Sequence, residues 1–441
     1  MAVIRSLMYL LLFLIATTQV AAQTDFIAMK GSIVDEENLP LPYINVSLRK
    51  DQSIGTYSNS FGDFEIKIPG TYSQDSIAFS CIGYETSVIS IAGINTPLNI
   101  VLKAKVYTLN EVVISSDSAV FILKKGIAQL GNNLYCGNSI IQGFYREMIL
   151  SDYACDRLIE AAVDVFDMGY CKSKDLQFRV REIRKSNDYR DLSWEQSIYN
   201  YISPRNGLCE HFESVFFNDY IRNNESYYNP MFAAPINAKE FLINNLLSID
   251  SVVEVDNNKV WCINIHSKIE TGDFSEQGTI YIRQKDYAIL QMEHQTLTNP
   301  ESTGRLSFPG EKYLHKTLIK YKEYNGKMYI SLLHRKAYRL TVNSEKLRKA
   351  KAAGKRGGQF FYDLLFVTNE IITEKDKAEA FKKKDRVLKK MDLYTKEWKY
   401  NEAFWDTYNI VKENPLEPVN KKGIERDLPL DEQFKKNGSN R

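Results

Sequence analysis

Apolar and polar residues alternate in the first quarter of the chain, in runs that are too short for helices. Within residues 63–68, Phe64, Ile66 and Ile68 alternate with three charged residues. A period of two is typical of a strand with one buried face, and residues 59–63 supply a tight turn just before it. Similar runs from residue 26 onward predict seven short strands, which fit a β-sandwich.

The hydrophobic period changes near residue 115. Val120, Leu123, Ile127 and Leu130 recur at helical spacing. They predict a linker helix within residues 115–135, and the Ser-Ser-Asp junction before it marks a domain boundary. We therefore expect a first domain over residues 23–114.

Residues 136–441 are predicted to form a larger α+β domain with a curved antiparallel sheet and covering helices. Between two of its apolar runs lies Asn325-Gly326, a dipeptide that favours a tight hairpin turn. The strand candidates are residues 141–151, 157–167, 176–183, 252–255, 260–265, 278–282, 287–294, 313–321, 328–333 and 360–372.

Two helices are predicted before the later strands, and the second is available to cover one face of the sheet. One lies around residues 210–220. The other begins at Asn237, where Glu240 three residues later completes a capping-box pattern, and runs through Leu247.

A third helix is predicted near the C-terminus, docked on the sheet. Phe404, Tyr408 and Val411 form one helical stripe that ends before Pro415. From Phe434 onward the chain is expected to be frayed.

Composition fits a globular protein of two or three domains. The 441 residues are 44% hydrophobic and 12% aromatic, which is enough to form hydrophobic cores. The net charge is +2, so the whole molecule presents no strong field toward nucleic acid.

The first 22 residues have the pattern of a signal peptide. Arg5 precedes an apolar run at residues 7–16, and small residues follow at positions 20–22. The mature chain would begin at Gln23 and would have no transmembrane segment, because no second apolar stretch of about 18 residues occurs. We therefore expect an exported protein of the periplasm or outer-membrane periphery.

Six cysteines in an exported chain permit disulfides. Cys81 lies in a strand pattern and is expected to be a buried small apolar residue. One or two bridges are expected among Cys136, Cys155, Cys171 and Cys209.

Residues 27–114 resemble the carboxypeptidase-like regulatory domain. The resemblance is carried by the run from Gly55 to Pro69 and by Ser80-Cys81-Ile82-Gly83-Tyr84. It implies a prealbumin-type, Ig-like β-sandwich of the kind seen beside zinc carboxypeptidases and in many envelope proteins of Gram-negative bacteria. Further matching segments are residues 31–35, 39–48, 98–102 and 109–114.

The strand order of residues 136–372 resembles the sheet of periplasmic lipoprotein carriers. That resemblance implies a sheet able to enclose an acyl chain.

The family that the sandwich resembles raises the possibility of a zinc peptidase site. Such a site needs His and Glu at fixed spacing around one metal, and no His-Glu-x-x-His occurs. Four histidines lie on predicted strands, where neighbouring strands could bring some of them together. The alternative is that each makes one local hydrogen bond. These histidines are His266, His294, His315 and His334.

Other chemical signatures are also missing from the sequence. There is no nucleophile elbow, phosphate loop or dinucleotide fingerprint. Asn59 and Asp63 could ligate calcium but are interpreted as turn residues, because the alternating acids of a calcium loop are missing. We therefore predict no catalytic residue, no metal ligand and no cofactor.

Two basic segments and the tyrosines leave alternatives open. The basic residues at 346–356 either contact anionic lipid or a sugar phosphate, or form a solvated loop. Those at 382–390 are interpreted as the outer face of a helix, with Phe381 and Val387 inward. The 27 tyrosines either line a glycan or lipid groove or reflect strand propensity alone.

These observations predict a non-enzymatic cell-envelope protein. Its sandwich would act as a docking module, and its sheet domain would bind a protein partner or an envelope ligand. One alternative is a carrier of acyl chains, which needs an apolar cavity. The other is a carboxypeptidase-like hydrolase with an unrecognised site, which needs convergent titratable groups.

Overall fold

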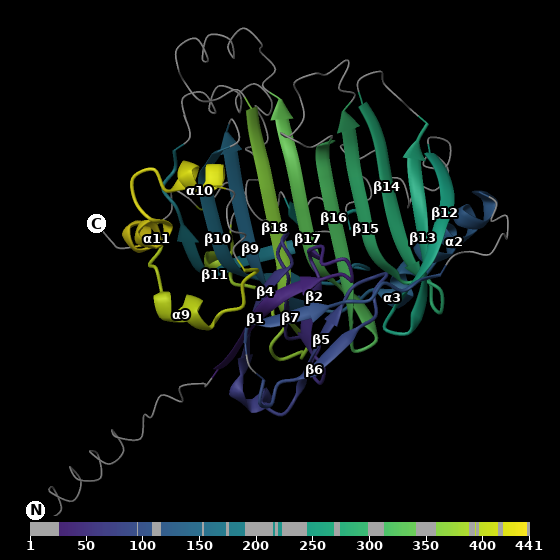
Figure 1. The fold of residues 1–441 in the computed structure, drawn as a ribbon, viewed down its shortest axis with the longest axis horizontal. Coiled ribbons are helices and arrows are strands. Elements are labelled where there is room, and N and C mark those ends of the chain that lie inside the picture. Colours follow the sequence, from purple (N-terminus) through teal and green to yellow (C-terminus); the bar gives the residue numbers. More distant parts are fainter. Residues whose placement is uncertain are drawn as a thin grey trace, which may run out of the picture.

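The computed structural model shows a mainly β protein, with a small sandwich in front of one face of a large sheet (Figure 1). The large sheet carries few helices. No described helix is long and apolar enough to cross a bilayer. The structure describes residues 26–94, 96–107, 116–151, 154–172, 176–189, 215–216, 219–222, 245–268, 274–298, 313–340, 359–387, 393, 397–412 and 418–438.

The sandwich consists of two sheets, with strand orders β4-β1-β7 and β3-β2-β5-β6. This confirms the seven predicted strands. Phe64, Ile66 and Ile68 are fully buried between the sheets, as their alternation predicts. The bounds are β1 (Phe26–Val34), β2 (Asn45–Leu48), β3 (Gly55–Tyr57), β4 (Asp63–Pro69), β5 (Ser76–Ser80), β6 (Ser87–Ser90) and β7 (Leu98–Val101), with a short 3₁₀ turn η1 (Gly70–Tyr72) after β4.

The turn before β4 is fixed by two residues. The Asn59 side-chain oxygen accepts hydrogen bonds from the backbone N–H groups of Phe61 and Asp63, both at 2.9 Å. Gly62 has φ +78°, and a Cβ there would lie 2.3 Å from the Ile33 carbonyl oxygen. Only glycine fits this position, so the turn and the strand that follows it are locally encoded.

The large sheet has eleven strands in the order β11-β10-β9-β18-β17-β16-β15-β14-β13-β12-β8, and all its pairings are antiparallel. Ten of these strands occupy the predicted strand segments. Asn325 and Gly326 both have positive φ, which is the tight hairpin geometry expected between β16 and β17. The bounds are β8 (Val106–Tyr107), β9 (Ser139–Ser151), β10 (Ala154–Asp167), β11 (Leu176–Lys185), β12 (Asn245–Val255), β13 (Asn258–Ser267), β14 (Phe274–Arg283), β15 (Ile289–Thr298), β16 (Tyr313–Tyr324), β17 (Lys327–Leu340) and β18 (Gln359–Ile372).

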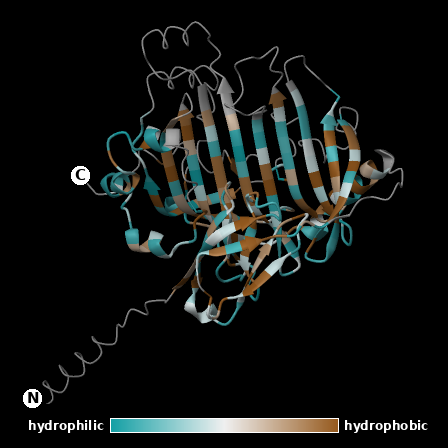
Figure 2. Cartoon of the chain, in the orientation of Figure 1, coloured by the Kyte–Doolittle hydropathy of each residue, from teal (hydrophilic) through white to brown (hydrophobic). Residues whose placement is uncertain are grey.

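The two faces of the large sheet pack against different partners, and hydrophobic and polar bands alternate along its strands (Figure 2). Leu333 lies in the main core cluster together with Ile122 of α2. Its neighbour Leu332 points the other way and packs with Tyr57 of the sandwich. We call these the core face and the sandwich face.

Helices α2 (Ser116–Ala128) and α3 (Leu130–Asn133) occupy the segment of the predicted linker helix. The helix predicted from Asn237 is wrong at its end, because residues 245–247 belong to β12 and pair with β13. Most of the helix predicted at 210–220 and residues 237–244 lie outside the described residues. Val215 and Phe216 are helical.

The C-terminal segment departs from the predicted single helix. Helix α9 (Glu402–Thr407) ends early, because Tyr408 is extended and its hydroxyl donates to the Gly143 carbonyl at 2.8 Å. Phe434 is buried within α11, so this end is docked rather than frayed. Residues 383–385 form only a 3₁₀ turn. The remaining elements are η2 (Lys383–Asp385), α10 (Pro418–Ile424) and α11 (Leu430–Gly438).

Sandwich and sheet are joined at both ends of their contact. Strand β8, which follows the sandwich, pairs with β12 and completes the large sheet. At the other end, the Asn409 side chain accepts from the Lys67 N–H at 2.6 Å and donates to the Lys67 carbonyl at 3.0 Å. The relative position of the two parts is therefore fixed by the chain itself.

One disulfide is present among the described cysteines. Cys136 and Cys171 are bonded, with Cα atoms 5.1 Å apart. This confirms a bridge within the predicted group. Cys155 is a free, buried thiol, Cys81 is free and half-buried, and Cys209 lies outside the described residues.

Candidate ligand cleft

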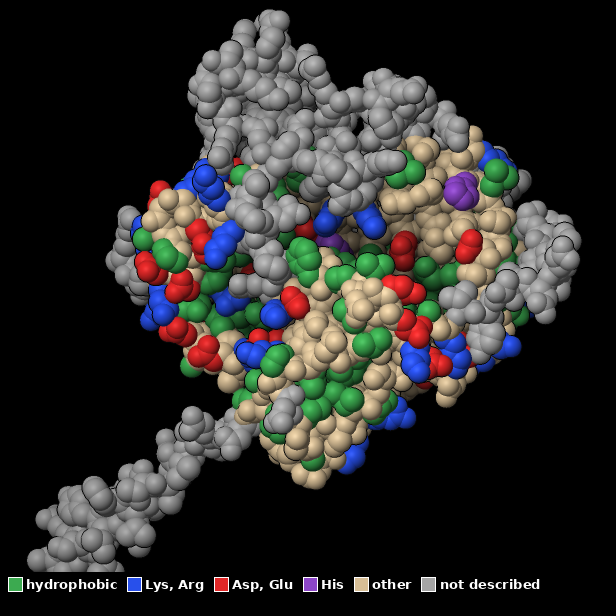
Figure 3. All heavy atoms as spheres, viewed as in Figure 1, with side chains coloured by type: hydrophobic (Ala, Val, Ile, Leu, Met, Phe, Trp, Pro, Cys, Tyr) green, Lys and Arg blue, Asp and Glu red, His purple; other side chains and the backbone are tan. Residues whose placement is uncertain are grey.

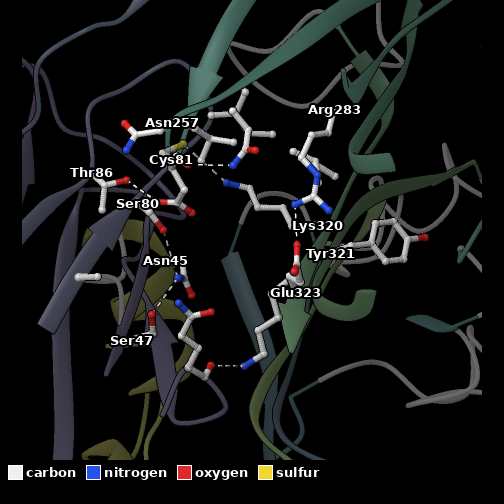
Figure 4. A pocket seen from close by; sticks show the side chains of 18 of the residues that line it. Asn45, Ser47, Ser80, Cys81, Thr86, Asn257, Arg283, Lys320, Tyr321 and Glu323 are labelled. Carbon is white, nitrogen blue, oxygen red and sulfur yellow. Dashed lines mark hydrogen bonds and ion pairs between the residues drawn. The ribbon is translucent and has the colours of Figure 1, made fainter. Parts of the chain in front are cut away.

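A cleft of about 850 Å³ lies between the sandwich and the large sheet. In the space-filling view, acidic and basic side chains gather where the sandwich meets the strands on the right of the picture (Figure 3). The close-up shows one wall contributed by the sandwich and the other by the large sheet (Figure 4).

The sandwich wall is built by alternation on β2 and β5. Val46 points into the sandwich core, so its neighbours Asn45 and Ser47 point into the cleft. The Asn45 amide donates to the hydroxyls of Ser47 at 3.2 Å and of Ser80 at 3.3 Å. The result is a surface of amide and hydroxyl groups.

The sheet wall is built by alternation on β16. Ile319 faces the core, and Lys320 and Lys322 face the sandwich. The Lys320 ammonium donates to the Tyr43 carbonyl at 2.8 Å and lies 4.0 Å from the Cys81 sulfur. The Lys322 ammonium donates to the Ser53 carbonyl at 3.2 Å, so both lysines reach across to the first domain.

Several charges of the walls are paired. Arg283 holds Glu323 at 2.6 Å, and Lys105 holds Glu254 at 2.6 Å. Burial lowers the pKa of the Lys322 ammonium group to about 8. The more distant carboxylates of Asp51 and Glu370 raise this pKa, but by less than burial lowers it.

The walls are held in place independently of any ligand. The Tyr57 hydroxyl donates to the Ser331 hydroxyl at 2.8 Å, and the Thr86 hydroxyl donates to the Asp256 carboxylate at 2.7 Å. With the pairing of β8 and β12, these contacts make the cleft a preformed site.

The predicted histidines are spread over both faces. His334 lies on the sandwich face and contacts Asp363 at 2.7 Å, while His266 is exposed on that face, in a groove of about 210 Å³ that Lys316 also lines. His294 is on the core face. Among the described residues, no group of three or more His, Cys, Asp or Glu side chains is placed to hold a metal ion.

His294 is enclosed by polar groups of the core face. Its ring lies 3.3 Å from the Tyr220 hydroxyl and 3.9 Å from the Glu276 carboxylate. Burial lowers the pKa of His294 to about 3, helped by the charges of Arg335 and His315. A neutral imidazole there contributes to packing and hydrogen bonding.

A buried polar cluster on the core face was not predicted. Asp219 accepts hydrogen bonds from Tyr170 at 2.7 Å and Tyr321 at 3.0 Å, and Arg222 pairs with Asp167 at 2.5 Å. Burial raises the pKa of both tyrosines well above the ordinary value. These groups come from segments up to about 150 residues apart, so no local spacing could indicate them. They fasten residues 219–222 to the sheet.

Two more predicted features lie outside the described residues. They are the signal peptide at residues 1–22 and the basic segment at 346–356. Of the second basic segment, residues 382–387 are described. Phe381 is buried and Val387 packs on the core face, as expected, but without a helix.

Comparison with known proteins identifies the first domain. Residues 29–114 match the family described as CarboxypepD_reg-like domain. No curated protein matches the chain.

Two solved structures resemble the chain at low scores. A LolA superfamily protein from Nitrosomonas europaea is 9% identical, with a TM-score of 0.23 over 62% of this chain and 99% of its own. A DUF1329 family protein from Desulfovibrio piger is 10% identical, with a TM-score of 0.23 over 58% of this chain and 94% of its own. The family match covers residues 29–114, which include most of the sandwich and the strand β8 that follows it. The sandwich is therefore a CarboxypepD_reg-like domain.

Proposed function

We propose that the protein is a non-enzymatic binding protein of the cell envelope, with the cleft between sandwich and sheet as its ligand site. The observation that carries this proposal is the preformed cleft, whose walls come from both domains. Its volume lies in the range of small-molecule sites. The sandwich serves as half of the site as well as a docking module.

The lining favours a polar ligand over an acyl chain. The walls present the side chains of Asn45, Ser47, Lys320 and Lys322, whereas an acyl chain requires apolar walls. On the core face, Leu123 of α2 and Phe216 already pack against the apolar side chains of the sheet.

The disulfide supports an exported location. Bonds such as Cys136–Cys171 persist in oxidising compartments and are rare in the cytosol. This agrees with the signal peptide expected at residues 1–22.

Native mass spectrometry of the protein purified from its own envelope tests the proposal. A polar ligand should co-purify with the wild type and be absent from Ser80→Trp, which fills the cleft. The matched control is Ser90→Trp, at an exposed position on β6 of the same small sheet. A fatty acid, stoichiometric zinc, or a ligand retained by Ser80→Trp would contradict the proposal.

A further inference from the structure

We infer that the cleft binds an acidic sugar, either a sugar acid or a sugar phosphate, with its anionic group against Lys320 or Lys322. This inference rests on the proposed function, because it names the ligand class of the same cleft.

The two lysines place two cationic groups in the sheet wall, and their ammonium groups reach toward opposite ends of β2. They are two residues apart on β16, so their side chains leave the strand on the same face, roughly 7 Å apart along it. Their hydrogen bonds go to backbone carbonyls of the sandwich, at Tyr43 and at Ser53. Carbonyl groups orient an ammonium group but do not neutralise its charge.

Four carboxylates line the cleft, and no described ion pair joins any of them to these two lysines. Glu323 and Glu254 are held by Arg283 and Lys105, and Asp256 accepts from the Thr86 hydroxyl; the fourth is Glu85. Among the described residues, neither Lys320 nor Lys322 forms an ion pair with a carboxylate. An anion beside either ammonium group would therefore supply negative charge that the cleft does not provide there.

The remainder of the lining fits a polyhydroxylated body. Asn45, Ser47 and Ser80 on one wall and Gln291 on the other offer both donors and acceptors. Sugar hydroxyls can pair with all of these groups, while an apolar anion would leave them without partners.

Isothermal titration with three probes tests the inference: glucuronate, glucose 6-phosphate and glucose. At least one of the two anions should bind the wild type with a Kd at least tenfold below that of glucose. The better anion indicates whether the group bound is a carboxylate or a phosphate. Lys320→Met with Lys322→Met should weaken its binding at least tenfold.

Two further variants control this experiment. Lys316→Met changes an exposed lysine on the same strand and face, outside the cleft, and should leave binding unchanged. Lys320→Arg with Lys322→Arg keeps both charges and should keep the preference for the anion, even if the methionine variant folds poorly.

Two outcomes would overturn the inference. One is equal binding of glucose and the anions, unaffected by the methionine variant. The other is failure of both anions to bind the wild type. After either result, the Ser80→Trp comparison still tests whether the cleft is a ligand site. Failure of this inference can therefore be distinguished from failure of the proposed function.

Discussion

Ionisable side chains in this protein are held in low-dielectric surroundings at several places, and each is stabilised differently. Glu160 is fully buried between Arg146 and Arg184, at 2.6 and 2.5 Å, and these charges lower its pKa despite burial. No carboxylate of the described residues pairs with Lys322, and His294 is kept neutral. A buried charge is tolerated where an opposite charge lies close by, and otherwise the group shifts toward its neutral form.

The neutral state of His294 predicts a loss of stability in mild acid. Its pKa is about 3 in the folded protein and 6.5 ordinarily, so below pH 6.5 the unfolded chain takes up a proton that the folded protein does not. The free energy of unfolding then falls as the pH drops toward 3, by about 2 kcal/mol at pH 5 from this group alone.

Urea unfolding at pH 7 and pH 5 checks this prediction. His294→Gln should lose less stability between these values than the wild type, by about 2 kcal/mol. His266→Gln, at an exposed position on the neighbouring part of the sheet, should behave like the wild type. An equal loss in wild type and His294→Gln would contradict the assignment.

At the scale of elements, the disulfide links the start of β9 with the end of β10. Cys136 and Cys171 are separated by 35 residues, and this link closes the hairpin that the two strands form. Cross-linking a loop of this size restricts the unfolded chain.

Removing the disulfide should lower stability by a few kcal/mol. We expect Cys136→Ser with Cys171→Ser to reduce the free energy of unfolding by about 2–5 kcal/mol. Denaturant unfolding with and without dithiothreitol measures it, because the reductant should lower the wild type to the level of the variant. A wild type unaffected by reductant would show that the bond contributes nothing.

The sequence predicts well those elements that are determined by neighbouring residues in the chain. Phe64, Ile66 and Ile68 follow a period of two, and Asn325-Gly326 supplies positive φ, so strand and hairpin are determined by a few neighbouring residues. The capping pattern at Asn237 predicts a helix through Leu247, but pairing with β13 places residues 245–247 in a strand.

The cleft could not be predicted, because its walls come from distant parts of the chain. The charged residues of β16 are recognisable as the polar side of a strand. Nothing in that pattern shows that Lys320 meets the backbone of Tyr43, 277 residues earlier. Sites formed by docking of two domains depend on tertiary packing, for which a single sequence carries no local signal.

At the scale of the whole molecule, the C-terminal segment fastens the sandwich to the sheet. Asn409 bonds both backbone groups of Lys67 in β4, and Arg146 of β9 donates to the Val411 carbonyl at 2.9 Å. Trp405 packs in the same cluster as Tyr57 of the sandwich. This segment therefore bridges both domains.

Loss of the Asn409 side chain should loosen the docking locally. Asn409→Ala removes two hydrogen bonds worth about 1 kcal/mol each, so hydrogen exchange at the Lys67 amide should accelerate at least tenfold. Asn409→Asp keeps the acceptor and should give a smaller effect. Amides in the centre of β10 should exchange as in the wild type, and unchanged exchange at Lys67 would refute the bridging role.

The pairing of β8 with β12 has a consequence for any shortened form of the chain. β12 lies next to the end of the large sheet, and its outer side is covered by the two residues of β8 that follow the sandwich and by the Gly83 N–H, which donates to the Glu254 carbonyl at 3.1 Å. Deleting the first domain together with this strand would uncover an open row of backbone donors and acceptors, along with the apolar cluster around Leu332. Such borders recruit other chains, so the truncated protein should aggregate.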